Sequence, residues 1–105
     1  MSYAITWTEE ALSTFEDRIT YLKIHWTERE IISFKKRVVE YLNILETEPL
    51  IAKKPGRFKN VHMGLILKQV SLIYRVKPLT KEIELISFVD NRQNPKRIKK
   101  YKPRQ

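Results

Sequence analysis

Two consecutive stretches of the sequence carry apolar side chains at the spacing of amphipathic helices, and this pair of stripes limits the possible folds most strongly. In both stretches the apolar residues recur at intervals that place them on one helix face. The first stripe comprises Leu12, Phe15, Ile19, Leu22 and Trp26, and the second comprises Ile31, Phe34, Val38, Tyr41, Leu42 and Leu45. Two helices alone cannot bury both stripes, so we expect both to pack on a further layer of structure.

Short polar motifs mark the starts of these two helices. Thr27 and Glu30 form a capping box, in which the hydroxyl and the carboxylate each accept a hydrogen bond from the backbone N–H group of the other residue. Thr6 or Thr8 can cap the first helix. The connection at residues 25–27 is short, which predicts an antiparallel helical hairpin.

Strand-like sequences precede and follow the helical hairpin. Residues 3–7 alternate apolar with small or polar side chains, which predicts a short strand with one apolar face. Gly64 is expected to mark a bulge or a break in the strand that contains it. Further strands are predicted over residues 58–67, 72–77 and 82–89, with short turns at 68–71 and 78–81.

These elements fit one α+β domain. A chain of 105 residues supplies a single modest hydrophobic core. We predict the element order β-α-α-β-β-β over residues 1–95, with the helical hairpin packed on one face of a small, mostly antiparallel sheet. Residues 96–105 are predicted to be a basic C-terminal tail.

Composition argues against several other classes of protein. The chain has no cysteine, which excludes disulfides and thiolate metal ligands and favours a reducing compartment. Its first residues do not resemble a secretory leader, and no apolar run is long enough to span a membrane. We therefore expect a soluble, cytoplasmic protein with no metal, no small-molecule cofactor and no membrane partner.

The charge is large and unevenly distributed. The net charge is +9, from 21 basic and 12 acidic side chains. Residues 1–48 hold 6 basic and 9 acidic side chains, residues 49–81 hold 8 and none, and residues 82–105 hold 7 and 3. Lysines that only keep a small protein soluble would explain the excess, but they explain the acid-free stretch poorly. The distribution favours an anion-binding surface, which we expect on the tail and on the sheet face opposite the helices.

Four segments, together with the element order, resemble the toxins of the bacterial RelE/ParE toxin-antitoxin superfamily, of the plasmid stabilisation type. They are the strand-to-helix entry at 5–11, the helix exit at 42–49, the strand at 72–76 with its Tyr-Arg pair, and the last strand with its continuation at 83–92. The resemblance implies a toxin that a cognate antitoxin neutralises. RelE-like members are metal-independent ribonucleases that cut messenger RNA in the ribosome, whereas ParE-like members poison DNA gyrase.

Arg75 is the first candidate for binding the target. Strand alternation places it on the face opposite the apolar residues, and a guanidinium grips two phosphate oxygens at once. Lys59, Lys68 and Lys77 are expected to complete a cationic face with it. The alternative for Arg75 is an ordinary solvent-facing strand residue. Arg92 follows the last strand, where a loop can present it to the target.

A ribonuclease would also need an acid or base, and His62 is the one histidine within the predicted sheet. His62, Arg75 and Arg92 therefore form the predicted catalytic set, although a single histidine is more often an ordinary polar residue. After the last strand, the chain lacks the His or Tyr that several ribonuclease members carry. This departure favours a toxin that acts by binding, while a non-toxic basic nucleic-acid-binding module is the alternative.

Overall fold

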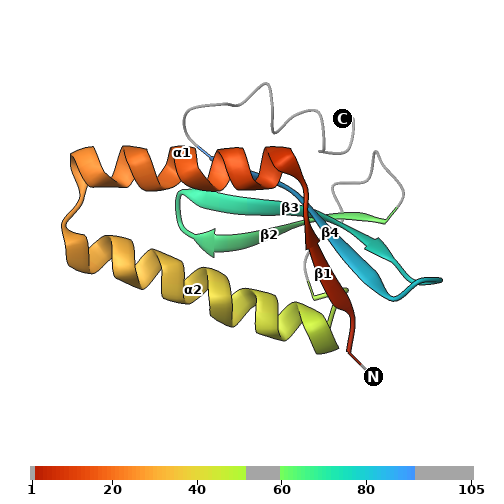
Figure 1. The fold of residues 1–105 in the computed structure, drawn as a ribbon. Coiled ribbons are helices and arrows are strands. Elements are labelled where there is room, and N and C mark those ends of the chain that lie inside the picture. The colour runs from red at the N-terminus through yellow and green to blue at the C-terminus, as the bar shows by residue number, and fades with distance from the viewer. Residues whose placement is uncertain (1, 52–59, 92–105) are drawn as a thin grey trace, which may run out of the picture.

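The computed structural model describes residues 2–51 and 60–91, and its element order is the predicted β-α-α-β-β-β (Figure 1). The elements are β1 (Ala4–Trp7), α1 (Glu9–His25), α2 (Glu28–Thr47), β2 (Val61–Leu67), β3 (Val70–Lys77) and β4 (Glu82–Asp90). The predicted domain end at residue 95 and the tail at 96–105 lie outside the described residues. No helix within the described ranges is long and apolar enough to cross a membrane.

The strands form one sheet in the order β1-β4-β3-β2, and both helices lie across the same face of it (Figure 1). β1 runs parallel to β4, whereas the β2–β3 and β3–β4 pairs are antiparallel. This arrangement confirms the prediction of a mostly antiparallel sheet with a helical hairpin on one face. β1 and β2 are the edge strands.

The helix starts follow the capping motifs. Thr8, and not Thr6, caps α1, and its hydroxyl also donates a hydrogen bond of 2.7 Å to the carbonyl of Leu85 in β4. At α2 the Thr27 hydroxyl accepts from the N–H of Glu30 at 3.3 Å, and the Glu30 carboxylate accepts from the N–H of Thr27 at 3.1 Å. The predicted capping box is thus confirmed.

The core lies between the helical hairpin and the sheet. Phe34 of α2 stacks on Phe15 of α1 with ring centroids 5.8 Å apart, and Phe15 lies 5.3 Å from Phe88 of β4. Such aromatic contacts stabilise a core beyond the area they bury. Most of the predicted stripes are confirmed: Leu22, Ile31, Phe34, Val38 and Leu45 are buried, and Phe15, Ile19, Trp26, Tyr41 and Leu42 pack against them while partly exposed.

Leu12 is the exception, because it is 48% exposed, which corrects the prediction that it is buried. α1 faces the sheet through Ala11 and Thr14 instead, and the Thr14 hydroxyl accepts a hydrogen bond of 2.9 Å from the backbone N–H of Phe88. Small side chains allow the helix to approach β4 closely. The buried stripe of α1 is therefore centred on Ala11 and Thr14, and Leu12 is turned toward solvent.

Gly64 of β2 has a different role from the predicted bulge. A Cβ atom on Gly64 would overlap the hydroxyl oxygen of Tyr41, so the glycine makes room for this tyrosine of α2. The register shift of β2 against β3 occurs further along, between Leu65 and Leu67. A close approach of side chain to backbone, and not a bulge, requires glycine here.

The bulge leaves Ile66 without a partner residue on β3, and α2 supplies the missing hydrogen bonds. Both Nε and one terminal nitrogen of Arg37 donate to the Ile66 carbonyl, at 3.4 and 3.3 Å. Arg37 therefore satisfies a polar backbone group at the edge of the sheet.

Candidate functional site

Arg75 lies on the sheet face away from the helices, as strand alternation predicted. It is exposed, and its neighbours across the strands are Val61 of β2 and Glu84 of β4. Within the described residues no ion pair or hydrogen bond involves its side chain. Its guanidinium is therefore available to bind an external group.

Lys77 lies on the same face of β3 but has an acidic neighbour. Its Nζ is 3.6 Å from a carboxylate oxygen of Glu84, and the two side chains are 43% and 29% exposed. An ion pair this accessible to water contributes little to stability. Glu84 thus offsets the charge of Lys77, while Arg75 has no ion-pair partner among the described residues.

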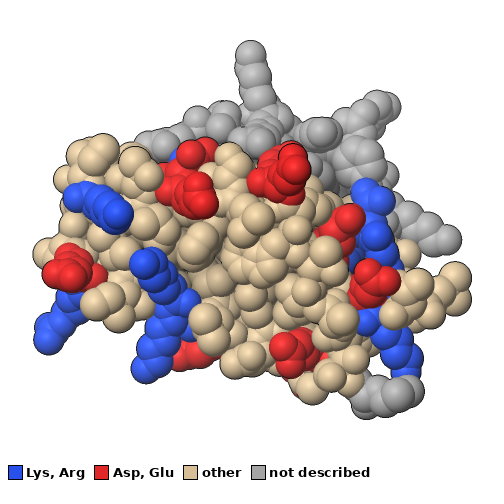
Figure 2. Space-filling model, viewed as in Figure 1, with Lys and Arg blue, Asp and Glu red and all other residues tan. Residues whose placement is uncertain are grey.

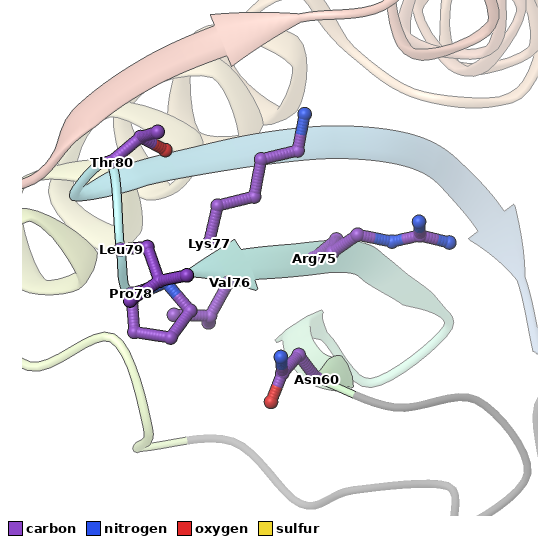
Figure 3. Close-up of a pocket in the computed structure, with 7 residues that line it drawn as sticks. All are labelled: Asn60, Arg75, Val76, Lys77, Pro78, Leu79 and Thr80. Carbon is purple, nitrogen blue, oxygen red and sulfur yellow. The ribbon is translucent and has the colours of Figure 1, made fainter.

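A surface pocket of about 710 Å³ opens beside these cations at the β3–β4 turn (Figure 3). It is lined by Asn60, Arg75, Val76, Lys77, Pro78, Leu79 and Thr80. In Figure 3 the Lys77 side chain extends toward β4 and the Arg75 side chain extends away from Pro78 and Leu79. The cations border the pocket without converging in it, so the pocket does not form a clamp for a single phosphate.

Between the two ends of β3, this sheet face carries a small apolar cluster. Val61, Ile73 and Val89 are buried there as a small cluster, against which Met63 and Ile86 pack. This cluster separates the two ends of β3. The expectation that this face carries the surplus positive charge stays a prediction, because the excess of basic side chains belongs to residues outside the described ranges.

The surplus charge lies elsewhere in the chain. Residues 2–51 and 60–91 hold 10 basic and 12 acidic side chains, whereas residues 52–59 and 92–105 hold 11 basic and no acidic ones, which accounts for the 21 and 12 of the whole chain. On the helix side, basic and acidic side chains are interspersed around a central area without charged residues (Figure 2). The described body is thus nearly neutral, and the two segments joined to it carry the excess.

His62 lies on the other face of the sheet from Arg75. It pairs with Tyr74 across the strands, is only 2% exposed, and its ring stacks on the Tyr74 ring at a centroid distance of 5.4 Å. The structure therefore does not bring His62 and Arg75 together. Tyr74 is fully buried.

The surroundings of His62 form a polar contact within the core. The Tyr74 hydroxyl donates a hydrogen bond of 2.9 Å to the carbonyl of Pro49, just after α2. Burial raises the pKa of Tyr41 above 10.0, and a hydrogen bond with Tyr74 opposes part of that rise. These side chains join α2 to β2 and β3 and have a structural role.

Of the remaining predicted residues, the structure describes only Lys68, and it lies away from Arg75. Lys68 is exposed in the β2–β3 turn, at the opposite end of β3 from Lys77. At about 3.3 Å per residue, the five steps from Val70 to Arg75 span roughly 16 Å. Lys59 and Arg92 lie outside the described residues.

The end of β4 is held on both faces of the sheet by contacts that we call the β4-exit clamp, formed by Arg18, Ser71, Asp90 and Asn91. Asp90 is 4% exposed, and its carboxylate lies 3.2 Å from a guanidinium nitrogen of Arg18 on α1. Asn91 accepts a hydrogen bond of 2.9 Å from the Ser71 hydroxyl, and its amide donates one of 3.3 Å to the carbonyl of Lys68. Successive residues are thus fixed to α1 and to the β2–β3 turn.

Sequence reasoning missed this clamp. Arg18 and Asp90 are 72 positions apart, and Ser71 and Asn91 are 20 apart. No local pattern links residues at such separations, because their contact depends on the packing of α1 on β4 and on the strand register. Only the Asp90-Asn91 sequence after a strand drew attention to this end.

The protein is a small α+β domain with a helical hairpin over one face of a four-stranded sheet. Solved toxin-antitoxin structures share it. A chain of the chromosomal ParDE system from P. aeruginosa matches with a TM-score of 0.66 and 20% identity, covering 85% of this chain and 96% of that one. A chain of the RelBE2 complex from Mycobacterium tuberculosis matches with a TM-score of 0.60 and 18% identity, covering 86% and 99%.

The archaeal RelE-RelB complex from Pyrococcus horikoshii gives a third match, with a TM-score of 0.61 and 16% identity over 89% and 99% of the two chains. No protein-family model and no curated protein matches the sequence. The chain therefore has the fold of the ParE and RelE toxins, at sequence identities that establish the fold alone.

Proposed function

We propose that this protein is the toxin component of a type II toxin-antitoxin module of the RelE/ParE superfamily, neutralised by a cognate antitoxin. The fold likeness supports this most directly, because it extends over nearly the full length of the chains in the three toxin-antitoxin structures. A charge excess confined to segments beside an otherwise neutral body is consistent with a nucleic-acid machine as the target.

Within this class, a toxin that acts by binding, as ParE-like gyrase poisons do, is the favoured mechanism. A ribonuclease needs an acid or base beside the cations that hold the phosphate. His62 is buried on the helix side of the sheet, away from Arg75. The separation of His62 from Arg75 is the reason for preferring a toxin that acts by binding. Arg75 and Arg92 are then the proposed binding residues, with Lys59, Lys68 and Lys77 in support.

One observation keeps a RelE-like ribonuclease as the second candidate. Glu84 lies across the strands from Arg75 and within 3.6 Å of Lys77, so a carboxylate and two cations meet on one exposed face. In a ribonuclease, the Glu84 carboxylate would accept the proton of the attacking 2′-hydroxyl, and Arg75 would stabilise the charge on the phosphate. Glu84→Gln would then abolish RNA cleavage.

The test is expression of the wild type without antitoxin, beside Arg75→Ala with Arg92→Ala. Growth, intact messenger RNA and gyrase-linked DNA breaks are followed together. We expect the wild type to stop growth with trapped DNA breaks, and the double variant to be less toxic by about tenfold or more, the loss expected for a charge-assisted contact.

The matched control is Arg29→Ala with Lys36→Ala, which removes the same charge from exposed positions on α2 and should remain toxic. Loss of RNA that Glu84→Gln prevents would establish the ribonuclease instead. Normal growth with soluble wild-type protein at confirmed levels would contradict an active toxin and favour the non-toxic nucleic-acid-binding module.

A further inference from the structure

The β3–β4 turn carries the most exposed large apolar side chain of the described residues. Leu79 is 100% exposed, and the next most exposed, Ile24 on α1, is 74% exposed. Pro78 and Thr80, on either side of Leu79, are exposed as well. A side chain that is fully accessible to water buries no apolar area, so Leu79 adds nothing to the hydrophobic stabilisation of the fold. Its whole apolar area is therefore available to a partner.

The turn that presents this leucine is fixed by backbone contacts. The N–H of Ala4 in β1 donates a hydrogen bond of 2.9 Å to the carbonyl of Lys81. The N–H of Val76 donates one of 2.9 Å to the carbonyl of Asn60, just before β2. The turn projects beyond the helical hairpin (Figure 1). Because a turn that is already fixed loses little conformational freedom on binding, it suits a contact with another molecule.

The surface pocket at this turn has a volume of about 710 Å³, which is in the range of ligand-binding pockets. Pro78 and Leu79 supply exposed apolar surface to it. In Figure 3 these two residues lie together at the end of β3, and the Arg75 side chain extends away from them. The pocket thus combines an apolar part at the turn with a guanidinium at its border.

The charges around the pocket are balanced, which argues against nucleic acid as its occupant. Residues 70–90, which contain the β3–β4 hairpin, hold three basic and three acidic side chains. Of the two lining cations, Lys77 is offset by Glu84, whereas Arg75 has no ion-pair partner among the described residues.

Nucleic-acid grooves need several cations along the backbone, and they stack bases on aromatic rings. None of the described residues that line this pocket is aromatic. One cation beside apolar surface matches a carboxylate beside an apolar side chain, which is the chemistry of a polypeptide.

We propose that this pocket binds a segment of the target protein that carries an apolar side chain next to an acidic one. Pro78 and Leu79 contact the apolar side chain, and the Arg75 guanidinium binds the carboxylate through two hydrogen bonds. The apolar contact supplies affinity, and the charge pair supplies specificity.

This inference rests on the proposed function and narrows it. The site is assigned to the target and not to the antitoxin, because Arg75 is the proposed target-binding residue. The β3–β4 turn then contacts the protein part of the nucleic-acid machine and leaves the phosphates to other cations.

NMR titration of the isotope-labelled protein tests the chemistry of the pocket without any need for toxicity. The probes are a short peptide with Glu next to Leu, the same peptide with Ser in place of Leu, and a single-stranded DNA oligonucleotide. The first peptide should shift the amide signals of Leu79 and Thr80 at millimolar concentration. The Ser peptide should bind about tenfold more weakly, because it lacks the apolar side chain. DNA should leave both signals in place.

Two variants and a matched control connect this binding to growth inhibition. Leu79→Ser and Arg75→Ala should each weaken binding of the first peptide about tenfold. They should also raise the amount of protein needed to halve the growth rate by a similar factor. Their melting temperatures should equal that of the wild type, because both side chains are exposed. The control is Ile24→Ser, which removes an exposed apolar side chain from α1 and should change neither property.

The outcomes separate this inference from the proposed function. Absence of shifts with the first peptide, or shifts of the Leu79 and Thr80 signals with DNA alone, would overturn the inference. A toxic wild type whose toxicity Leu79→Ser leaves intact would also overturn it. If that fully toxic variant escaped neutralisation by coexpressed antitoxin, the pocket would belong to the antitoxin. A non-toxic wild type would overturn the proposed function, and the titration would still decide what the pocket binds.

Discussion

The two faces of the sheet are built differently. The helix-covered face carries a continuous core in which Phe34, Leu72, Tyr74 and Phe88 are almost fully buried. The far face has only a small apolar cluster around Ile73, with exposed cations at both ends of β3. Stability is concentrated on the first face because apolar burial is the dominant favourable term in folding.

This difference leaves the exposed ends of the far face available for binding, whereas the cluster between them is buried. Residues that no packing contact requires, such as Arg75, can serve a target without affecting the fold. For the proposed toxin, we therefore expect substitutions on the two faces to have different effects. Substitutions under the helices should change the free energy of unfolding, and substitutions at the ends of the far face should change toxicity.

The largest effect is expected for Phe34→Ala, which empties a fully buried site beneath α2. A change of this type costs about 3–5 kcal/mol. Val61→Ala in the far-face cluster removes less apolar volume and should cost about 1–3 kcal/mol. Urea unfolding followed by circular dichroism measures both. An equal loss for the two variants would contradict the contrast between the faces.

Gly64→Ala should have the next largest effect, because its Cβ would overlap the Tyr41 side chain. Overpacking of this kind costs about 1–3 kcal/mol. In a Tyr41→Leu background the obstructing ring is absent, so the same substitution should cost much less. If the cost of Gly64→Ala is the same in both backgrounds, Tyr41 is not what requires glycine at this position.

A smaller effect concerns stability at alkaline pH. Burial holds the pKa of Tyr41 above 10.0 in the folded protein, with the Tyr74 hydrogen bond acting against it. The folded state thus keeps a proton that the unfolded state releases, so this stability is complete below pH 10 and is lost as pH rises through the raised pKa. Tyr41→Phe should flatten the decline in unfolding free energy measured from pH 9 upward. If the decline of the unfolding free energy with pH is unchanged in this variant, the buried Tyr41 hydroxyl is not its cause.

The smallest effect on stability is expected at the far-face cations. Lys77→Ala breaks an exposed ion pair with Glu84 and should change the free energy of unfolding by less than about 1 kcal/mol. Arg75→Ala should be within about 0.5 kcal/mol of wild type, because the exposed side chain makes no hydrogen bond or ion pair with a described residue. Thermal unfolding checks both, and a marked loss for Arg75→Ala would mean that the residue supports the fold.

Local features of the sequence predicted the elements well. The capping box at Thr27, the helical periodicity and the strand alternation all act over a few residues, and the structure follows them. The same alternation placed Arg75 on the face away from the helices. The prediction that Leu12 is buried was wrong because the periodicity of α1 allowed two neighbouring faces of the helix to face the sheet. The close contact of Ala11 and Thr14 with β4 selected the face that does not carry Leu12.

The candidate site was less predictable. Arg75 and Lys77 are near each other because one strand carries both, whereas Lys68 was assigned to the same surface although it lies at the far end of that strand. The net charge also did not predict where the charges lie in space. The acid-free stretch indicated a basic sheet face, but in the structure β4 brings Glu84 against Lys77. Strand pairing mixes charges that are separate in the sequence.

By itself, the sequence determined the element order, the helix starts, the antiparallel hairpin and the confinement of the excess charge to particular segments, because backbone preferences and periodicity are short-range properties. The tertiary structure decided which distant residues meet. It buried His62 on the helix side of the sheet, fitted Gly64 against Tyr41, and joined Arg18 to Asp90 across 72 positions. These contacts follow from strand register and from the depth at which each helix packs, which depend on all the elements together.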